Sequence, residues 1–178
     1  MMARYVTVLF AAVVLAGAAA VGVSAAKPEE AAAASTVTVR TCTEGSIALE
    51  AKEKRSLDLH NNVRKSRGLR ALCVHPALQR AARAHSADMI NRDYFSHGSV
   101  GPRLKRHDYN WRVYGENIAW GSGSLGSADS IFKGWMNSSG HKRNILDGRF
   151  REVGIGAATG NYKGRSGVTM WTADFGAR

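Results

Sequence analysis

The segment 115–156 constrains the fold most, because it alternates strand-like and helix-like patterns around polar side chains. Residues 115–121 and 150–156 alternate large and small side chains, which predicts two β-strands. Between them, residues 135–146 read W-M-N-S-S-G-H-K-R-N-I-L, which predicts the end of one helix and the start of another. Glu116 and His141 lie at junctions between these elements, where side chains from different elements can meet.

Glu116 is the least ordinary residue of this segment. In the predicted strand 114–120 its side chain shares a face with Ile118 and Trp120. A carboxylate on an apolar face is costly unless it is paired or hydrogen-bonded. We therefore expect Glu116 to meet polar partners in a cleft.

Two histidines are candidates for those partners. His97 follows two aromatic residues in the sequence Y-F-S-H and precedes Gly98, so its loop should be tightly held. His141 lies near the start of a predicted short helix, where a ligand anion would be favoured. His85 falls within the apolar stripe of a predicted helix, and we interpret it as a packed or cleft-wall histidine.

The remaining periodicity predicts an α+β domain. Helices are expected over 47–67, 76–92 and 128–137, and strands over 114–120, 152–158 and 168–175, with a glycine-rich hairpin loop over 159–167. The order of helices, strand, helix and hairpin favours helical layers on a mainly antiparallel sheet. The basic run 103–107 predicts a short helix with an exposed basic face.

The first residues differ from the rest of the chain. Residues 1–26 combine Arg4, an apolar run and small residues at its end, which is typical of a secretory signal peptide. An uncleaved membrane anchor is the alternative. Residues 27–46 have few large side chains and predict a flexible linker with a short extended piece over 36–40. The folded domain is expected over 47–178.

Charge and cysteine content point outside the cell. Without residues 1–26 the chain has 24 basic and 14 acidic residues, a net charge of +10. In an exported chain this favours anionic lipid surfaces, wall polymers or acidic glycans as partners. Nucleic acid is not expected, because no recognition motif is present and export removes the chain from the genome. Cys42 and Cys73 predict one disulfide worth about 3–4 kcal/mol. We expect a monomer.

Seven motifs in this sequence occur in the order of a known family: L-x-x-H-N-x-x-R (57–64), G-L-x-x-L (68–72), Y-F-S-H (94–97), G-E-N-I-A (115–119), W-M-N-S-x-G-H-x-x-N-I-L (135–146), E-V-G-I-G (152–156) and W-T-A-D-F-G (171–176). They resemble the CAP superfamily of cysteine-rich secretory proteins, venom antigens and plant pathogenesis-related proteins, in its compact bacterial branch. The resemblance implies a secreted α-β-α sandwich, with a central antiparallel sheet and a polar cleft.

In many CAP proteins two His and two Glu line that cleft and hold a divalent cation such as zinc. His97, Glu116 and His141 match three of these positions. The fourth departs, because Ser138 stands where animal members often have Glu. Asn117 and Asn144 are the expected hydrogen-bonding supports, and Ser138 is a third expected supporting residue. The alternative is a polar cluster of the same three residues that only fixes the cleft.

Three functions are compatible with this cleft. The resemblance favours a binding module for lipid or sterol, cell-envelope or protein ligands. The first alternative is a metal-dependent, peptidase-like hydrolase, since two His and one carboxylate leave a coordination position for water. Catalysis is the weaker reading, because the chain has no H-E-x-x-H and no nucleophile beside a base. The second alternative is a basic structural factor held to the cell wall.

Overall fold

The computed structural model describes residues 35–178, so the predicted signal peptide and the first eight residues of the predicted linker lie outside the described residues. The elements follow the order β1 (Thr36–Arg40), β2 (Ser46–Glu50), α1 (Ala51–Ser66), β3 (Cys73–Val74), α2 (Pro76–Asn91), α3 (Val100–Arg106), β4 (Val113–Ser122), a 3-10 turn (Gly123–Gly126), α4 (Ala128–Asn137), α5 (Ser139–Leu146), β5 (Glu152–Tyr162) and β6 (Arg165–Ala177). None of the described helices has the length and apolar character needed to cross a membrane.

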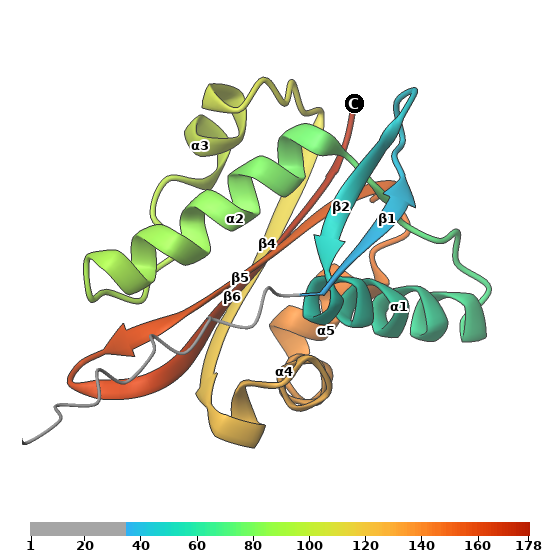
Figure 1. The fold of residues 1–178 in the computed structure, drawn as a ribbon. Helices are drawn as coiled ribbons and strands as arrows, with labels where there is room; N and C mark the ends of the chain where they lie inside the picture. The colour runs from blue at the N-terminus through green and yellow to red at the C-terminus, as the bar shows by residue number, and fades with distance from the viewer. Residues whose placement is uncertain (1–34) are drawn as a thin grey trace, which may run out of the picture. The chain divides into compact units, whose positions relative to one another are not determined.

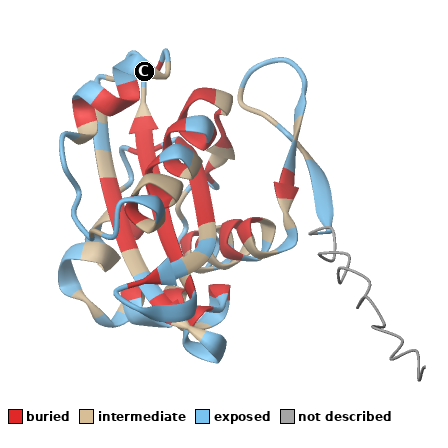
Figure 2. Cartoon of the chain, turned by 60° about the vertical axis from the view of Figure 1, so that its left-hand side comes forward, coloured by how far each residue is buried: buried red, intermediate tan, exposed pale blue. Residues whose placement is uncertain are grey.

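The central sheet has four strands in the order β3-β5-β6-β4. β4, β5 and β6 are antiparallel, and the short β3 runs parallel to β5. Helices α2 and α3 cover one face, and α1, α4 and α5 lie on the other (Figure 1). The buried residues follow the sheet and the inner sides of these helices (Figure 2). The predicted α+β sandwich is confirmed.

Helix α2 lies unusually close to strand β5. A Cβ atom added at Gly154 would come within 2.1 Å of the backbone of Leu78, and one at Gly156 within 2.4 Å of the backbone of Ala82. Only glycine permits this approach, because any side chain would push the helix away from the strand. The two glycines therefore set the height of α2 above the sheet, and with it the position of His85.

The N-terminal part of the domain corrects one expectation. Residues 36–50 form an antiparallel hairpin of β1 and β2, where we expected a linker up to residue 46 and a helix from residue 47. The alternation of Val37 and Val39, and of Ile47 and Leu49, favours strands. Leu49 is fully buried and packs into the main core, so the hairpin is anchored to the domain.

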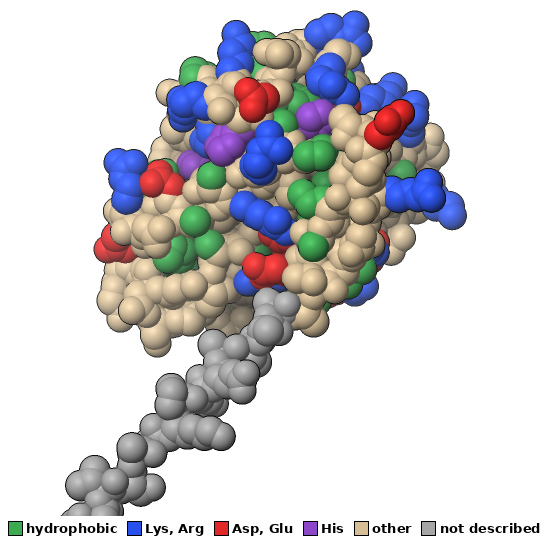
Figure 3. Space-filling model, turned by 45° about the horizontal axis from the view of Figure 1, so that its top comes forward, with side chains coloured by type: hydrophobic (Ala, Val, Ile, Leu, Met, Phe, Trp, Pro, Cys, Tyr) green, Lys and Arg blue, Asp and Glu red, His purple; other side chains and the backbone are tan. Residues whose placement is uncertain are grey.

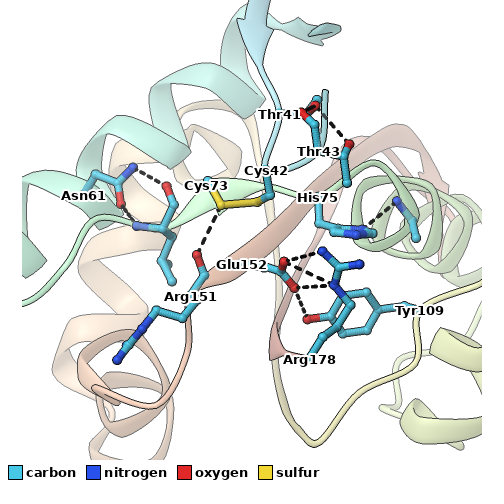
Figure 4. The surroundings of a disulfide bond; sticks show 12 residues. Thr41, Cys42, Thr43, Asn61, Cys73, His75, Tyr109, Arg151, Glu152 and Arg178 are labelled. Carbon is cyan, nitrogen blue, oxygen red and sulfur yellow. Dashed lines mark hydrogen bonds and ion pairs between the residues drawn. A yellow bond between two sulfur atoms is a disulfide. The ribbon is translucent and has the colours of Figure 1, made fainter. Parts of the chain in front are cut away.

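The predicted disulfide is present between Cys42 and Cys73, with their Cα atoms 5.3 Å apart. Figure 4 shows it joining the segment after β1 to the start of β3. The backbone N–H of Cys42 also donates to the carbonyl of Val74 at 2.8 Å. The covalent bond therefore ties the hairpin to the edge of the central sheet.

The C-terminal hairpin is longer than expected. β5 and β6 extend to Tyr162 and from Arg165, so the turn is limited to Lys163 and Gly164 instead of the predicted loop over 159–167. Lys163 and Gly164 have positive φ angles of 48° and 73°, as a tight two-residue hairpin turn requires. The Tyr162 ring at the end of β5 packs against the Trp120 ring of β4. This contact holds the end of the hairpin, where the glycines of 159–167 offer no side chain to pack.

Candidate functional site

The candidate site crosses β4, the edge strand of the sheet. Glu116 points to the α2–α3 face of β4, while the next residue, Asn117, points to the α4–α5 face. Side chains from α4 and α5 donate hydrogen bonds to backbone carbonyls of β4. Asn144 Nδ2 donates to the Glu116 carbonyl at 3.1 Å, and Trp135 Nε1 donates to the Ile118 carbonyl at 3.2 Å. The edge is therefore covered by side chains at Glu116 and Ile118, which opposes pairing with another strand at this point.

Glu116, Arg103 and His97 form a closed group on the α2–α3 face. His97 Nδ1 lies 2.6 Å from Glu116 Oε1, and Arg103 Nη2 pairs with Glu116 Oε2. Arg103 Nη1 also donates to the His97 carbonyl at 2.9 Å. The Glu116 and Arg103 side chains are 1% and 9% exposed, whereas His97 is 51% exposed. A buried ion pair thus holds an accessible imidazole in place.

Asp174 of β6 lies directly opposite Glu116 and is fully buried. Within residues 35–178 neither of its carboxyl oxygens has a hydrogen-bond partner, and Arg103 Nη2 lies 3.8 Å from Oδ1. Burial and the negative charge of Glu116 raise the pKa of Asp174 well above its usual value. Burial also raises the pKa of Glu116, while Arg103 opposes that effect. The pair therefore shares one negative charge, which Glu116 carries beside Arg103.

His85 of α2 forms the inner wall of this group. Its Nε2 lies 3.0 Å from the Ser96 carbonyl and 4.0 Å from Glu116 Oε2. Burial and the charge of Arg103 lower the pKa of His85 to about 4. Its interpretation as a hydrogen-bonded cleft-wall histidine agrees with this position.

His141 lies on α5, and its backbone carbonyl makes its hydrogen bond with β4. Asn117 Nδ2 donates to the His141 carbonyl at 3.0 Å, and Asn144 Nδ2 donates to Asn117 Oδ1 at 2.9 Å. Burial and the nearby His97 lower the pKa of His141. The two asparagines thus link α5 to β4, and their role as supports of a functional cleft stays a prediction. Ser138 only joins α4 to α5, and its side chain makes no capping hydrogen bond.

Sequence reasoning missed Arg103 and Asp174. Arg103 belongs to the basic run interpreted as an exposed face, but the structure buries it against Glu116. The prediction that the Glu116 carboxylate needs a partner was the signal that could have pointed to a buried cation. Asp174 shares a strand face with the buried Thr172 and Met170, so the same cost of burying a carboxylate could have identified it.

The residues as arranged do not fit a metal ion. Both Glu116 oxygens are engaged, one by His97 and the other by a guanidinium that would repel a cation. Among the described residues no group of three or more His, Cys, Asp or Glu is placed to hold a metal. Glu152 cannot complete such a set, because it binds Tyr109 at 2.6 Å and Arg178 at 3.0 Å (Figure 4).

The fold agrees with a known class of protein. Residues 57–175 match the model of the CAP family, described as the cysteine-rich secretory protein family. The match covers most of the chain, and the chain therefore belongs to the CAP family.

Bacterial relatives are similar over most of this chain. Bacillus subtilis (strain 168) YkwD is 34% identical over 140 residues, which cover 76% of this chain and 51% of YkwD. The membrane protein YlbC of the same organism is 34% identical over 109 residues, 58% of this chain and 31% of YlbC. The chain thus spans about half or less of the length of these relatives.

A solved structure confirms the fold. An extracellular protein with an SCP domain from Bacillus anthracis superposes with a TM-score of 0.61 and 30% identity, covering 71% of this chain and 40% of that one. A cysteine-rich secretory protein from Staphylococcus aureus shares the fold alone, with a TM-score of 0.55 and 16% identity over 76% of this chain and 43% of that one.

A zinc or other divalent-cation site stays a prediction of the resemblance. The ion pair between Arg103 and Glu116 leads us to expect that zinc does not bind there. We expect calorimetric titration of residues 27–178 with zinc to show no stoichiometric site, because binding would require Glu116 to leave Arg103. Variants His97→Ala and His141→Ala should then titrate like the parent. One tight site that both substitutions remove would show that the three residues converge on a metal.

Acid should destabilise the domain through its buried histidines. Burial lowers the pKa of His60 to about 4, its Nδ1 is bonded to the Ser56 carbonyl, and its Nε2 lacks a partner within residues 35–178. The unfolded imidazole titrates near 6.5, so between about pH 6.5 and 4 the unfolded state binds more protons. This contribution is complete above pH 6.5 and falls by about 3 kcal/mol as the pH drops to 4.

The variant His60→Gln should therefore lose stability less steeply with acid than the parent. Asp174 acts in the opposite direction, since its raised pKa means that the folded state takes up a proton first. Denaturant unfolding at several pH values gives the slope of the unfolding free energy against pH for the parent and for His60→Gln. Because Asp174 is present in both proteins, its contribution cancels in the difference between the two slopes. Equal slopes for parent and His60→Gln would contradict the expected role of His60.

Proposed function

We propose that this chain is an extracellular binding module that attaches to the anionic bacterial envelope and takes a lipid ligand along β4. The observation that supports this most is the exposure of large aromatic side chains beside the site. Phe95, Tyr114 and Trp120 are 41%, 38% and 40% exposed. Tyr114 and Trp120 flank Glu116 on the same face of β4, and Phe95 precedes His97 by two residues.

Cations accompany these aromatic rings. Trp111 packs on Tyr114 at 4.5 Å between ring centroids and carries Lys105 Nζ 5.4 Å from its own centroid. Tyr162, which packs on Trp120, likewise has Lys163 Nζ 5.4 Å from its centroid. Aromatic rings suit the boundary between headgroups and acyl chains, and nearby cations attract anionic headgroups.

The wider surface has the charge that this attachment needs. The whole chain carries a net charge of +11. Figure 3 shows Lys and Arg side chains spread over the face it presents, instead of gathered in a single patch. The B. anthracis relative is described as extracellular and YlbC as a membrane protein, which supports an envelope location for this chain.

Sedimentation with lipid vesicles tests the proposal. We expect residues 27–178 to bind vesicles that contain phosphatidylglycerol, more weakly at high salt but still measurably, because apolar burial persists when charges are screened. Complete loss of binding at high salt would favour a factor held by charge alone. Absence of binding at low salt would contradict envelope attachment.

A further inference from the structure

A pocket lies between α2 and α3. These two helices cover one face of the sheet (Figure 1). The pocket has a volume of about 240 Å³ and is lined by Ala84, His85, Asp88, Arg103, Arg106 and His107. Arg103 and His85 form the boundary between this pocket and the Glu116 group. The exposed aromatic residues of β4 do not line it.

Arg103 has a donor that the protein leaves unused. Its Nη1 and Nη2 bind the His97 carbonyl and Glu116, but its Nε has no hydrogen-bond partner within residues 35–178. The side chain is only 9% exposed, so bulk water does not freely satisfy this N–H group. Buried donors without a partner are rare in folded proteins and call for an explanation.

The charge around the pocket is positive. Burial lowers the pKa of His107, and the guanidinium groups of Arg80, Arg106 and Arg103 lower it further. Arg80 Nη2 also donates to the His107 carbonyl at 3.1 Å, which fixes Arg80 beside the pocket. Three guanidinium groups thus lie close enough to affect one imidazole.

The acidic groups nearby are already engaged. Asp88 lines the pocket, but its Oδ2 accepts from Tyr94 at 2.6 Å and from Arg92 at 3.3 Å. Asp108 lies 3.8 Å from Arg80, and its side chain is 90% exposed. Arg103 already pairs with Glu116, but neither Asp88 nor Asp108 contacts Arg106, so the attraction of the pocket for an anion rests mainly on Arg106.

We infer that the pocket between α2 and α3 binds a phosphate group, with Arg103 Nε donating from the wall and Arg106 from the rim. Phosphate suits the pocket because its several oxygens can accept from donors that approach from different directions. The group can be free phosphate or the phosphate of a lipid headgroup. This site goes beyond the proposed attachment along β4 and does not depend on the aromatic residues there.

Titration of the folded domain with inorganic phosphate, followed by calorimetry, tests the inference. We expect binding that weakens about fivefold to tenfold in Arg106→Gln, which removes one charged donor. Arg112→Gln is the matched control, because it makes the same charge change at an exposed residue that does not line the pocket. It should bind phosphate nearly as the parent does.

A second variant tests the wall. Arg103→Lys keeps the charge but removes the Nε donor, and it should also weaken phosphate binding in protein whose circular dichroism is unchanged. Equal weakening of phosphate binding in Arg106→Gln and Arg112→Gln would overturn the inference. Absence of phosphate binding by the parent would also overturn it, unless Arg106→Gln weakens binding to phosphatidylglycerol vesicles and Arg112→Gln does not. That vesicle result would identify a headgroup as the source of the phosphate.

The variant Trp120→Ala separates this inference from the proposed function. If it lost vesicle binding but kept phosphate binding, the pocket would be confirmed as a separate site. Loss of phosphate binding in Trp120→Ala as well as in Arg106→Gln would contradict a separate pocket.

Discussion

The variant Glu116→Gln is expected to lower the free energy of unfolding by about 2 kcal/mol at neutral pH, less than the 3–5 kcal/mol typical of a broken buried ion pair. The substitution removes the anion that Arg103 contacts inside the protein. The loss is reduced because Asp174 can ionise once Glu116 no longer repels it, and Asp174 Oδ1 already lies 3.8 Å from Arg103.

Asp174→Asn gives the matched comparison. Asp174 is neutral beside an ionised Glu116, so this substitution should change stability by less than about 1 kcal/mol at pH 7. The double variant should lose more than the sum of the single variants, because no carboxyl group is left to ionise beside Arg103. Denaturant unfolding with the disulfide intact measures all four proteins. Additive losses would show that Asp174 does not take over the charge.

The variant Arg64→Met should destabilise the domain by about 4 kcal/mol, because it leaves several buried carbonyls without a donor. Arg64 is fully buried on α1. Its guanidinium donates to the carbonyls of Arg70, Ile145, Asp147 and Phe150 at 2.9 to 3.1 Å. One side chain thus joins the end of α1 to the segment between α5 and β5.

Two controls make this expectation specific. Arg67→Met removes an exposed guanidinium three residues away and should change the free energy of unfolding by no more than about 0.5 kcal/mol. Arg64→Lys keeps the charge but cannot span four carbonyls, so its loss should fall between the other two. Equal stability of Arg64→Met and Arg67→Met would show that the carbonyl contacts contribute nothing.

Local periodicity predicted most of the fold. The helix over 128–137 and the strands around Glu116 and Ile155 were expected from alternation and helical spacing, and the disulfide from cysteine number and export. The N-terminal hairpin was not expected, because its short strands owe their stability to Leu49 in a distant core and to the disulfide. Such contacts leave little trace in local sequence.

The site was predictable in part for the same reason. A carboxylate on an apolar face predicted that Glu116 needed a partner, but not which one. Arg103 resembles its exposed neighbours Lys105 and Arg106 in sequence, and only the packing of α3 against β4 distinguishes it. Asp174 lies opposite Glu116 because of the register between β4 and β6, although the two residues are 58 positions apart. Sequence periodicity did not predict that register.

The most direct test of envelope attachment along β4 compares Trp120→Ala with Val37→Ala in vesicle sedimentation at high salt. Both residues are about equally exposed, at 40% and 41%, but Val37 lies on the N-terminal hairpin and not beside the site. Binding to phosphatidylglycerol vesicles is expected to fall about tenfold in Trp120→Ala, as burial of a large aromatic ring implies. Val37→Ala should bind like the parent. Equal binding by both variants would contradict the proposed role of β4.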